Sequence, residues 1–328
     1  MSRPPSPPPA PPKPVPRSGW RRVLWGALTI VLGMGLAAAM LVALGLAMAY
    51  PNLPDVSELA DYRPKLPLRV YARDGSLLAE FGEERRNLVP FEDIPPVMIN
   101  AVLAIEDARF FEHSGIDYRG LLRAALANLG EAKSQGASTI TMQVARNVYL
   151  SSEKSYLRKI YEVLLTFKLE HLLTKEQILE IYMNQIFLGH RSYGFAAAAR
   201  TYFGKSLKDL TIAEAAMLAG LPKAPSAYNP ISNPKRARAR QLYIIDRMLE
   251  NGFITAAEAQ AAREEPLRLR RYDAEQAIHA EYIAEMVRQT IVERYGDDAY
   301  TAGLKVHTTI DPALQRAAWR AVRQGVLD

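Results

Sequence analysis

A long run of residues without charge near the N-terminus constrains this chain more than any other feature. Residues 23–50 contain no Lys, Arg, Asp or Glu, and a helix needs only about 20 apolar residues to cross a bilayer. A signal peptide ending at Ala47-Met48-Ala49 is the alternative, but the apolar core of such a leader is usually about 7–15 residues long. We therefore interpret residues 23–50 as an uncleaved transmembrane helix.

The residues before this run predict its orientation. Residues 1–22 are rich in Pro and contain basic residues but no acid, a composition that buries too little apolar surface to fold. Basic residues beside a transmembrane helix favour the cytoplasmic side. We expect a disordered cytoplasmic tail over residues 1–22 and a single-pass protein of the cytoplasmic (inner) membrane. The body after Tyr50 then lies on the outer, periplasmic face.

Charge and cysteine content exclude some classes of partner. The formal net charge is +6, and five of these charges lie in the first 22 residues, which leaves +1 for the rest of the chain. A nucleic-acid-binding body would instead carry Lys and Arg over a folded face, so we expect no nucleic-acid partner. There is no Cys, and no His pair has the spacing of metal ligands, so we predict no metal site.

Turn signals and periodicity predict a mainly α body with a small β element. Asp74-Gly75 lies between two short apolar runs, which is typical of a hairpin. Helical periodicity and the pairing of Thr with Glu or Gln three residues later, the capping box, predict a series of helices. The expected helices cover residues 95–108, 117–129, 139–149 and 156–173, and others begin at Thr174, Thr211, Thr255 and Asp311. Residues 303–310 alternate as a strand does.

Two adjacent carboxylates, Glu106 and Asp107, fall at the end of the first of these helices. The helix dipole disfavours negative charge there, and raising the pKa of a carboxyl group toward the working pH is one way to make a general base. Alone, the pattern is more typical of a solvated helix end.

A second cluster combines cations with a carboxylate. Arg158, Lys159 and Glu162 share one helical face, which we expect to lie opposite an apolar stripe that includes Ile160 and Phe167. An exposed, salt-bridged face is the alternative. The preceding Gly136–Arg146 segment places small hydroxyl residues at a helix start, a pattern typical of an anion site. Together these features indicate a phosphate ligand.

The order and spacing of these motifs resemble the peptidoglycan glycosyltransferase domain of class A (bifunctional) penicillin-binding proteins. The resemblance extends over roughly residues 66–328, and one departure is Met142 in place of the first residue of a glutamine pair. The blocks that carry it are Glu106-Asp107-x-x-Phe110-x-x-His113-x-Gly115, Gly136–Thr141, Arg158-Lys159-x-x-Glu162, Ile178–Asn184 and Tyr193–Lys205.

The resemblance implies a mainly α, lysozyme-like helical glycosyltransferase domain with one N-terminal transmembrane helix and a small β element. Such an inverting hexosyltransferase polymerises lipid II into β-1,4-linked glycan strands and releases undecaprenyl pyrophosphate. It makes Glu106 the general base and Glu162 the second essential carboxylate. The implied substrate-binding residues are Asp107, Phe110, His113, Ser138, Thr139, Gln143, Arg146, Arg158, Lys159 and Asn184.

The resemblance also implies a domain plan and a set of partners. Residues 51–90 form a linker and hairpin, residues 91–255 the glycosyltransferase domain, and residues 256–328 a linker to a transpeptidase domain missing from this chain. The partners are lipid II, the growing glycan strand, the membrane and other cell-wall synthesis or division proteins. No cofactor is required, although a divalent cation, Mg or Mn, is compatible with the family.

The chemistry of the leaving group separates the alternatives. Pyrophosphate is already a stable anion, so its departure requires cations and N–H donors more than a proton donor. A membrane-bound lytic glycosidase acting on peptidoglycan, the first alternative, needs an acid as well. A non-catalytic scaffold is the second. We interpret Ser151-Ser152-Glu153-Lys154 as a chance match to a transpeptidase motif, because its partner motifs are missing. We interpret Arg236, Arg238 and Arg240 as a solvated face.

Overall fold

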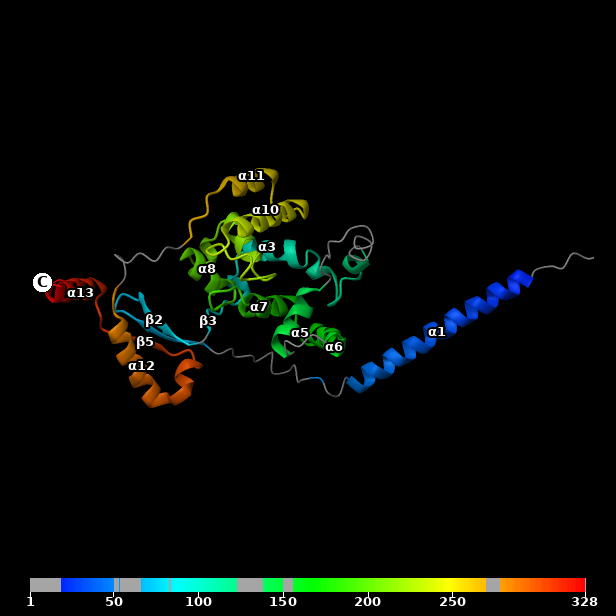
Figure 1. The fold of residues 1–328 in the computed structure, drawn as a ribbon, viewed down its shortest axis with the longest axis horizontal. Coiled ribbons are helices and arrows are strands. Elements are labelled where there is room, and N and C mark those ends of the chain that lie inside the picture. Colours follow the sequence, from blue (N-terminus) through cyan, green and yellow to red (C-terminus); the bar gives the residue numbers. More distant parts are fainter. Residues whose placement is uncertain are drawn as a thin grey trace, which may run out of the picture. The chain divides into compact units, whose positions relative to one another are not determined.

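The structure is a computed structural model, and it describes residues 19–49, 53, 66–82, 84–122, 138–149, 156–269 and 278–327 (Figure 1). The chain divides into two compact units, Met1–Leu53 and Pro54–Asp328. Residues 1–18 of the tail predicted over residues 1–22 lie outside the described residues, as does the Ser151–Lys154 motif. Residues 19–22 are helical, so the prediction of a disordered tail is wrong for these four residues.

The first unit contains a single long helix, α1 (Gly19–Ala49). The prediction of a helix over the uncharged run is therefore confirmed. Within the described part of the chain, no helix meets the combined length and apolarity that crossing a membrane requires. The role of α1 as a membrane anchor remains a prediction.

The second unit is mainly helical, as predicted. Its α-helices are α3 (Pro96–Glu106), α5 (Ile140–Tyr149), α6 (Tyr156–Leu172), α7 (Lys175–Gln185), α8 (Phe195–Phe203), α9 (Ile212–Ala219), α10 (Pro234–Glu250), α11 (Ala256–Glu264), α12 (Glu281–Tyr295) and α13 (Pro312–Leu327). Short 3-10 turns cover Phe91–Asp93 (η2), Phe110–Glu112 (η3), Leu207–Asp209 (η4) and Gly296–Tyr300 (η5). Residues 118–122 are also helical, and the remainder of the helix predicted over 117–129 lies outside the described residues.

Local sequence signals explain where these helices begin. Capping boxes form at Thr174, Thr211 and Thr255, so the predicted starts of α7, α9 and α11 are confirmed. Pro96 opens α3, where its missing N–H leaves no intrahelical bond unmade. Each of these elements begins within one residue of its predicted start.

Two small sheets accompany the helices. The predicted hairpin is confirmed, because β1 (Leu68–Tyr71) pairs antiparallel with β2 (Leu77–Phe81). The predicted C-terminal strand is β5 (Lys305–His307), which pairs parallel with β1. Part of the segment interpreted as a linker therefore belongs to the sheet of the hairpin. The second sheet joins β3 (Arg85–Arg86) to β4 (Ser192–Tyr193) in parallel.

The core that positions the site consists of two groups of helices. In one, α3, α9 and α10 pack against one another, and in the other α5 packs against α6 and α7 (Figure 1). The buried side chains of α3 include Met98 and Val102, and those of α10 include Ile244 and Met248. The carboxyl end of α3 is therefore held by a buried apolar interface.

Candidate active site

The candidate site forms where the end of α3 meets the start of α5. Helix α3 ends between the two predicted carboxylates, because Asp107 is its C-cap residue with φ −163° and ψ 77°. The Asp107 carboxylate accepts a hydrogen bond from the backbone N–H of Ile140, at 3.2 Å. Glu106 instead accepts one from the Gln143 side chain, at 2.7 Å. Adjacent carboxylates therefore contact two different residues in the first turn of α5.

The environment of Glu106 raises the pKa of its carboxyl group. Burial is the main cause, because it disfavours the charged form. The hydrogen bond from Gln143 and the positive charges of Arg240 and Arg146 oppose this effect, whereas the negative charge of Asp107 adds to it. The sequence predicted the direction of this pKa shift from the helix dipole, and the structure assigns it mainly to burial.

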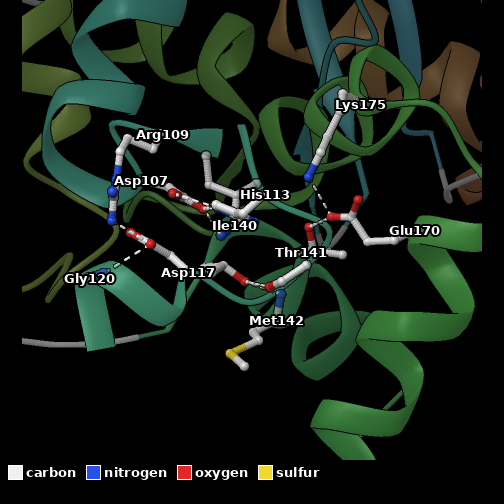
Figure 2. Close-up of polar contacts among 12 residues, drawn as sticks. Asp107, Arg109, His113, Asp117, Gly120, Ile140, Thr141, Met142, Glu170 and Lys175 are labelled. Carbon is white, nitrogen blue, oxygen red and sulfur yellow. Dashed lines mark hydrogen bonds and ion pairs between the residues drawn. The ribbon is translucent and has the colours of Figure 1, made fainter. Parts of the chain in front are cut away.

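Asp107 and His113 form a second, buried pair at the same helix end (Figure 2). The His113 Nε2 atom lies 3.0 and 3.1 Å from the two Asp107 oxygens. Phe110 is buried beneath it, with its ring edge-on to the imidazole. Gly115 has φ 91°, and a Cβ atom there would lie only 2.6 Å from Thr166 on α6. The motif therefore encodes a tight chain path as well as polar groups.

The start of α5 is less open to an anion than the sequence indicated. The Ile140 N–H bonds to Asp107, and the Met142 N–H bonds to the Thr139 hydroxyl at 3.3 Å. Thr139 is buried, and its hydroxyl donates to the Gly115 carbonyl at 2.6 Å. These two N–H groups are not open to an anion, because the Asp107 carboxylate and the Thr139 hydroxyl already accept from them. Thr139 acts here as a helix cap.

The cationic cluster on α6 is present, but its burial differs from the prediction. Glu162 is 1% exposed, whereas Ile160 and Phe167 are 39% and 44% exposed. The predicted orientation of α6 is therefore wrong, and its buried face includes Glu162, Leu165, Thr166 and Leu169. The charge of Glu162 is tolerated in the interior because Lys159 Nζ lies 2.6 Å from its carboxylate.

Lys159 connects this cluster to the start of α5. Its ammonium lies 3.4 Å from the Ser138 hydroxyl, and its side chain is 53% exposed. The ammonium is therefore accessible to a ligand, while Glu162 holds its position from within. Arg158 precedes it on α6 and is partly buried. Three predicted residues, Ser138, Lys159 and Glu162, thus lie together.

Asn184 is the predicted substrate-binding residue that the structure places elsewhere. Its side chain is buried and exchanges two hydrogen bonds with the backbone of Val89, at 3.0 and 2.8 Å. It also donates to the Glu180 carbonyl within α7. The two bonds to Val89 hold the segment before α3 against α7, so the Asn184 side chain has a structural role in this conformation.

Two residues near Glu106 were not predicted. Tyr182 on α7 is buried, its hydroxyl has no hydrogen-bond partner among the described residues, and burial together with the Glu106 charge raises its pKa well above the usual value. Arg240 on α10 acts on the Glu106 charge. Tyr182 lies within the Ile178–Asn184 block and Arg240 within the arginine run. The sequence therefore singled out both segments, but it did not indicate that these two side chains act on Glu106.

The arginine run is only partly a solvated face. Arg236 is exposed, as predicted, but Arg238 and Arg240 are partly buried. Arg238 donates to Gln241 at 2.6 Å and to the Arg263 carbonyl. The prediction fails for these two arginines because α10 packs on both α3 and α11, which covers the sides of the helix that carry them.

Within the described ranges, no group of three or more His, Asp or Glu side chains is arranged to hold a metal ion. Lys159 already occupies a position beside Glu162. The compatibility with Mg or Mn remains a prediction.

The fold and the site define a mainly helical domain with a partly buried, hydrogen-bonded glutamate, Glu106, and a second, buried glutamate paired with a cation, Glu162. The family model described as Transglycosylase matches residues 74–249. The chain belongs to this transglycosylase family, and the predicted resemblance to the glycosyltransferase domain of class A penicillin-binding proteins is confirmed.

Named relatives agree with this assignment. Penicillin-binding protein 1A of Neisseria flavescens is 51% identical over 293 residues, which cover 89% of this chain and 37% of that protein. The protein of the same name from Pseudomonas aeruginosa is 47% identical, over 93% of this chain and 37% of its own length. The crystal structure of Penicillin-Binding Protein 1A from Haemophilus influenzae shows 35% identity with a TM-score of 0.45, over 79% of this chain and 29% of that one. The chain thus spans well under half the length of these relatives.

Proposed function

We propose that this chain is a peptidoglycan glycosyltransferase that polymerises lipid II into β-1,4-linked glycan strands and releases undecaprenyl pyrophosphate. The observation that carries the proposal is the partly buried Glu106 carboxylate at the end of α3, with its raised pKa and its hydrogen bond from Gln143. A carboxylate with a raised pKa is a stronger base than one in water. The family match spans the whole of this site.

In this scheme Glu106 removes the proton from the 4-hydroxyl of the acceptor sugar. The resulting oxygen attacks the anomeric carbon of the donor from the face opposite the pyrophosphate. The bond between that carbon and the pyrophosphate oxygen breaks, and its electron pair leaves with the pyrophosphate. The configuration at the carbon is inverted, and the proton remains on Glu106 until solvent removes it.

The cationic cluster on α6 is suited to the leaving group. Pyrophosphate accumulates negative charge as the bond breaks, and positioned cations stabilise that charge. Lys159 has an accessible ammonium that Glu162 holds from the interior at 2.6 Å, and Arg158 adds a second charge beside it. We assign Lys159 and Arg158 to the pyrophosphate, with Ser138 as a nearby hydroxyl donor.

The Asp107–His113 pair supports the base rather than acting on substrate. Asp107 joins the end of α3 to the start of α5 through the Ile140 N–H, which sets Gln143 in place to reach Glu106. Phe110 and Thr139 fix the same junction through packing and capping. Arg146 also contributes a positive charge near Glu106. The scheme as proposed uses no metal.

We also propose a membrane anchor and a division of the chain into domains. We assign residues 23–50 to a transmembrane helix, residues 91–255 to the lysozyme-like glycosyltransferase domain, and residues 256–328 to a connection toward a transpeptidase domain. The greater length of the named relatives and the word penicillin-binding in their names support that plan. A reporter fused after Asp328 should be active only in the periplasm, and activity in the cytoplasm would contradict the orientation.

One assay separates the proposed function from its alternatives. Purified protein is incubated either with labelled lipid II or with mature peptidoglycan. The proposal predicts long glycan products from lipid II and no shortening of mature glycan. Shortened mature glycan without polymerisation would identify a lytic glycosidase, and no reaction with either substrate would favour a scaffold.

A further inference from the structure

A largely buried ion pair, Glu170 with Lys175, lies beside the start of α5 (Figure 2). The Lys175 ammonium lies 2.7 Å from the Glu170 carboxylate, and the two side chains are 18% and 9% exposed. Glu170 belongs to the last turn of α6, and Lys175 is the first residue of α7. The helix dipole disfavours a negative charge at the first of these places and a positive charge at the second. The dipoles of their own helices therefore do not explain these two charges.

One oxygen atom of Glu170 joins two neighbouring helices. The Thr141 hydroxyl on α5 donates to Glu170 Oε1 at 2.5 Å, and the Lys175 ammonium on α7 donates to the same atom (Figure 2). Thr141 is fully buried. Gly115 leaves room for the glutamate stem, because a Cβ atom there would lie 3.1 Å from Glu170 Cγ. Polar contacts to Glu170 therefore connect α5, α6 and α7.

Lys175 also contacts the turn that follows α3. Its ammonium lies 4.4 Å from the centroid of the Phe110 ring, within the roughly 6 Å range of cation–π attraction. The Phe110 N–H donates to the Asp107 carbonyl at 3.0 Å, and the Phe110 ring lies edge-on to His113. The ion pair is therefore in contact with the segment that holds Asp107 and His113.

The Thr141 hydroxyl belongs to the turn of α5 that reaches both carboxylates at the end of α3. The Ile140 N–H donates to Asp107 at 3.2 Å. The Gln143 side chain donates to Glu106 at 2.7 Å. Because these donors share the first turn of α5 with Thr141, the bond from Thr141 to α6 holds them in place relative to the end of α3.

Stability alone does not account for a buried ion pair of this kind. Replacing such a pair by apolar side chains of similar volume often leaves stability unchanged or higher, because both charges lose their hydration on burial. Removing only one partner is costly, since it leaves a buried charge unpaired. The charges add direction here, because one carboxylate oxygen accepts from both α5 and α7 at hydrogen-bond distance.

We propose that Glu170 and Lys175 are positioning residues that set the first turn of α5 against the turn after α3, and so align Gln143 with the Glu106 base. The inference rests on the proposed function of Glu106. It adds two residues that lie outside every motif block on which the family resemblance rests.

The test compares turnover with donor binding in the full chain. Glu170→Met with Lys175→Met replaces both charges by apolar side chains, so no buried charge is left unpaired and the Tm should stay close to that of the wild type. The kcat for lipid II polymerisation should fall roughly 10- to 100-fold, as it does when a catalytic group is misplaced. Affinity for a pyrophosphate-bearing donor analogue should change little, because the Lys159–Glu162 pair forms within α6.

Two further variants separate positioning from general electrostatics. Lys175→Arg keeps both the charge and a cation for the Phe110 ring, and should retain most of the turnover. Arg263 and Asp246 form an ion pair of the same 2.7 Å length between α11 and α10. Arg263→Met with Asp246→Met should leave kcat unchanged.

A milder variant decides the matter if the double variant folds poorly, which thermal unfolding identifies. Thr141→Val removes only the hydroxyl that reaches Glu170, and should lower kcat less severely, again without loss of donor affinity. If the wild-type chain polymerises lipid II and the folded variants keep normal kcat, or lose kcat and donor affinity equally, the inference is wrong while the proposed function stands. If the wild-type chain shows no polymerisation, the proposed function fails, and the inference fails with it.

Discussion

Gln143 donates a hydrogen bond of 2.7 Å to Glu106 and thereby connects the first turn of α5 to the last residue of α3. The carboxylate is partly buried, and this bond is the strongest of the influences that lower its pKa against the effect of desolvation. Gln143 therefore stabilises the charged form of the residue that we assign as the base.

Removing this donor should change the pH dependence of the enzyme. In Gln143→Met the volume is similar but the hydrogen bond is lost, so the pKa of Glu106 rises further and the base becomes protonated at a higher pH. The acid limb of kcat/KM should move to higher pH, with a smaller loss on the plateau. Gln260→Met, an exposed position on α11, is the control. An acid limb that stays at the same pH would show that Gln143 does not lower the pKa of Glu106.

Glu106 also predicts how stability varies with pH. Because the pKa of Glu106 is raised in the folded state, folding disfavours the ionised form of its carboxyl group. The contribution of this group to the free energy of unfolding is therefore lost as pH rises through the raised pKa. Glu106→Gln has no charge to bury, so its Tm should exceed that of the wild type at neutral and higher pH. The difference should vanish below the ordinary pKa of glutamate. Calorimetry across this range tests it, and a variant less stable than wild type at pH 8 would contradict the burial argument.

The Lys159–Glu162 pair predicts a shared loss of donor binding. Hydrogen bonds to charged groups contribute about 1.5–3 kcal/mol, so Lys159→Ala should weaken the binding of a pyrophosphate-bearing donor analogue roughly 10- to 100-fold. Glu162→Gln should also weaken the binding of this analogue, because it releases the Lys159 ammonium. Lys159→Ala should also lower the Tm more than Glu162→Gln does, since it leaves a buried carboxylate without its cation.

A surface pair provides the matched control for these variants. Lys208 and Asp93 form an ion pair of 2.6 Å with both side chains well exposed, and such pairs contribute about 0–1 kcal/mol. Lys208→Ala should change neither donor affinity nor Tm appreciably. Equal effects of Lys208→Ala and Lys159→Ala on donor affinity would show that general charge, and not the α6 pair, attracts the donor.

Exposed apolar side chains predict membrane contact by the catalytic unit itself. Tyr118, Leu121 and Leu122 share a helical turn and are 66%, 46% and 62% exposed, an unusual grouping for a soluble surface. A chain lacking residues 1–50 should remain active, depend on detergent and bind liposomes. Leu121→Ser with Leu122→Ser should reduce that binding, whereas Tyr282→Ser, on α12, should not. A truncated chain that is monodisperse without detergent and ignores liposomes would contradict this prediction.

Local signals predicted the elements of the fold well. The capping boxes, Pro96 and the Asp74-Gly75 turn each depend on bonds between residues a few positions apart, and the structure contains all of them. The pairing of β5 with β1 joins residues more than 200 positions apart, and no local pattern specifies such a partner.

Sequence patterns identified residues of the site better than they predicted the burial and contacts of those residues. Periodicity placed Ile160 and Phe167 inside and Glu162 outside, but Lys159 neutralises Glu162 and makes its burial tolerable. The side chain of Asn184 was assigned to substrate, yet it bonds to a backbone segment distant in sequence. Arg240 looked solvated because nothing in a run of arginines indicates which of them a neighbouring helix covers.

The division of roles between the two glutamates is the central claim, and donor affinity tests it most directly. Binding of a pyrophosphate-bearing donor analogue is measured for the wild type, Glu106→Gln and Glu162→Gln, together with turnover of lipid II. Glu106→Gln keeps the shape of the side chain but not its basicity, so turnover should fall by about two to four orders of magnitude while donor affinity changes little. Glu162→Gln should weaken donor affinity as well as turnover. Loss of donor binding in Glu106→Gln with normal binding in Glu162→Gln would show that the roles of base and leaving-group support are assigned to the wrong residues.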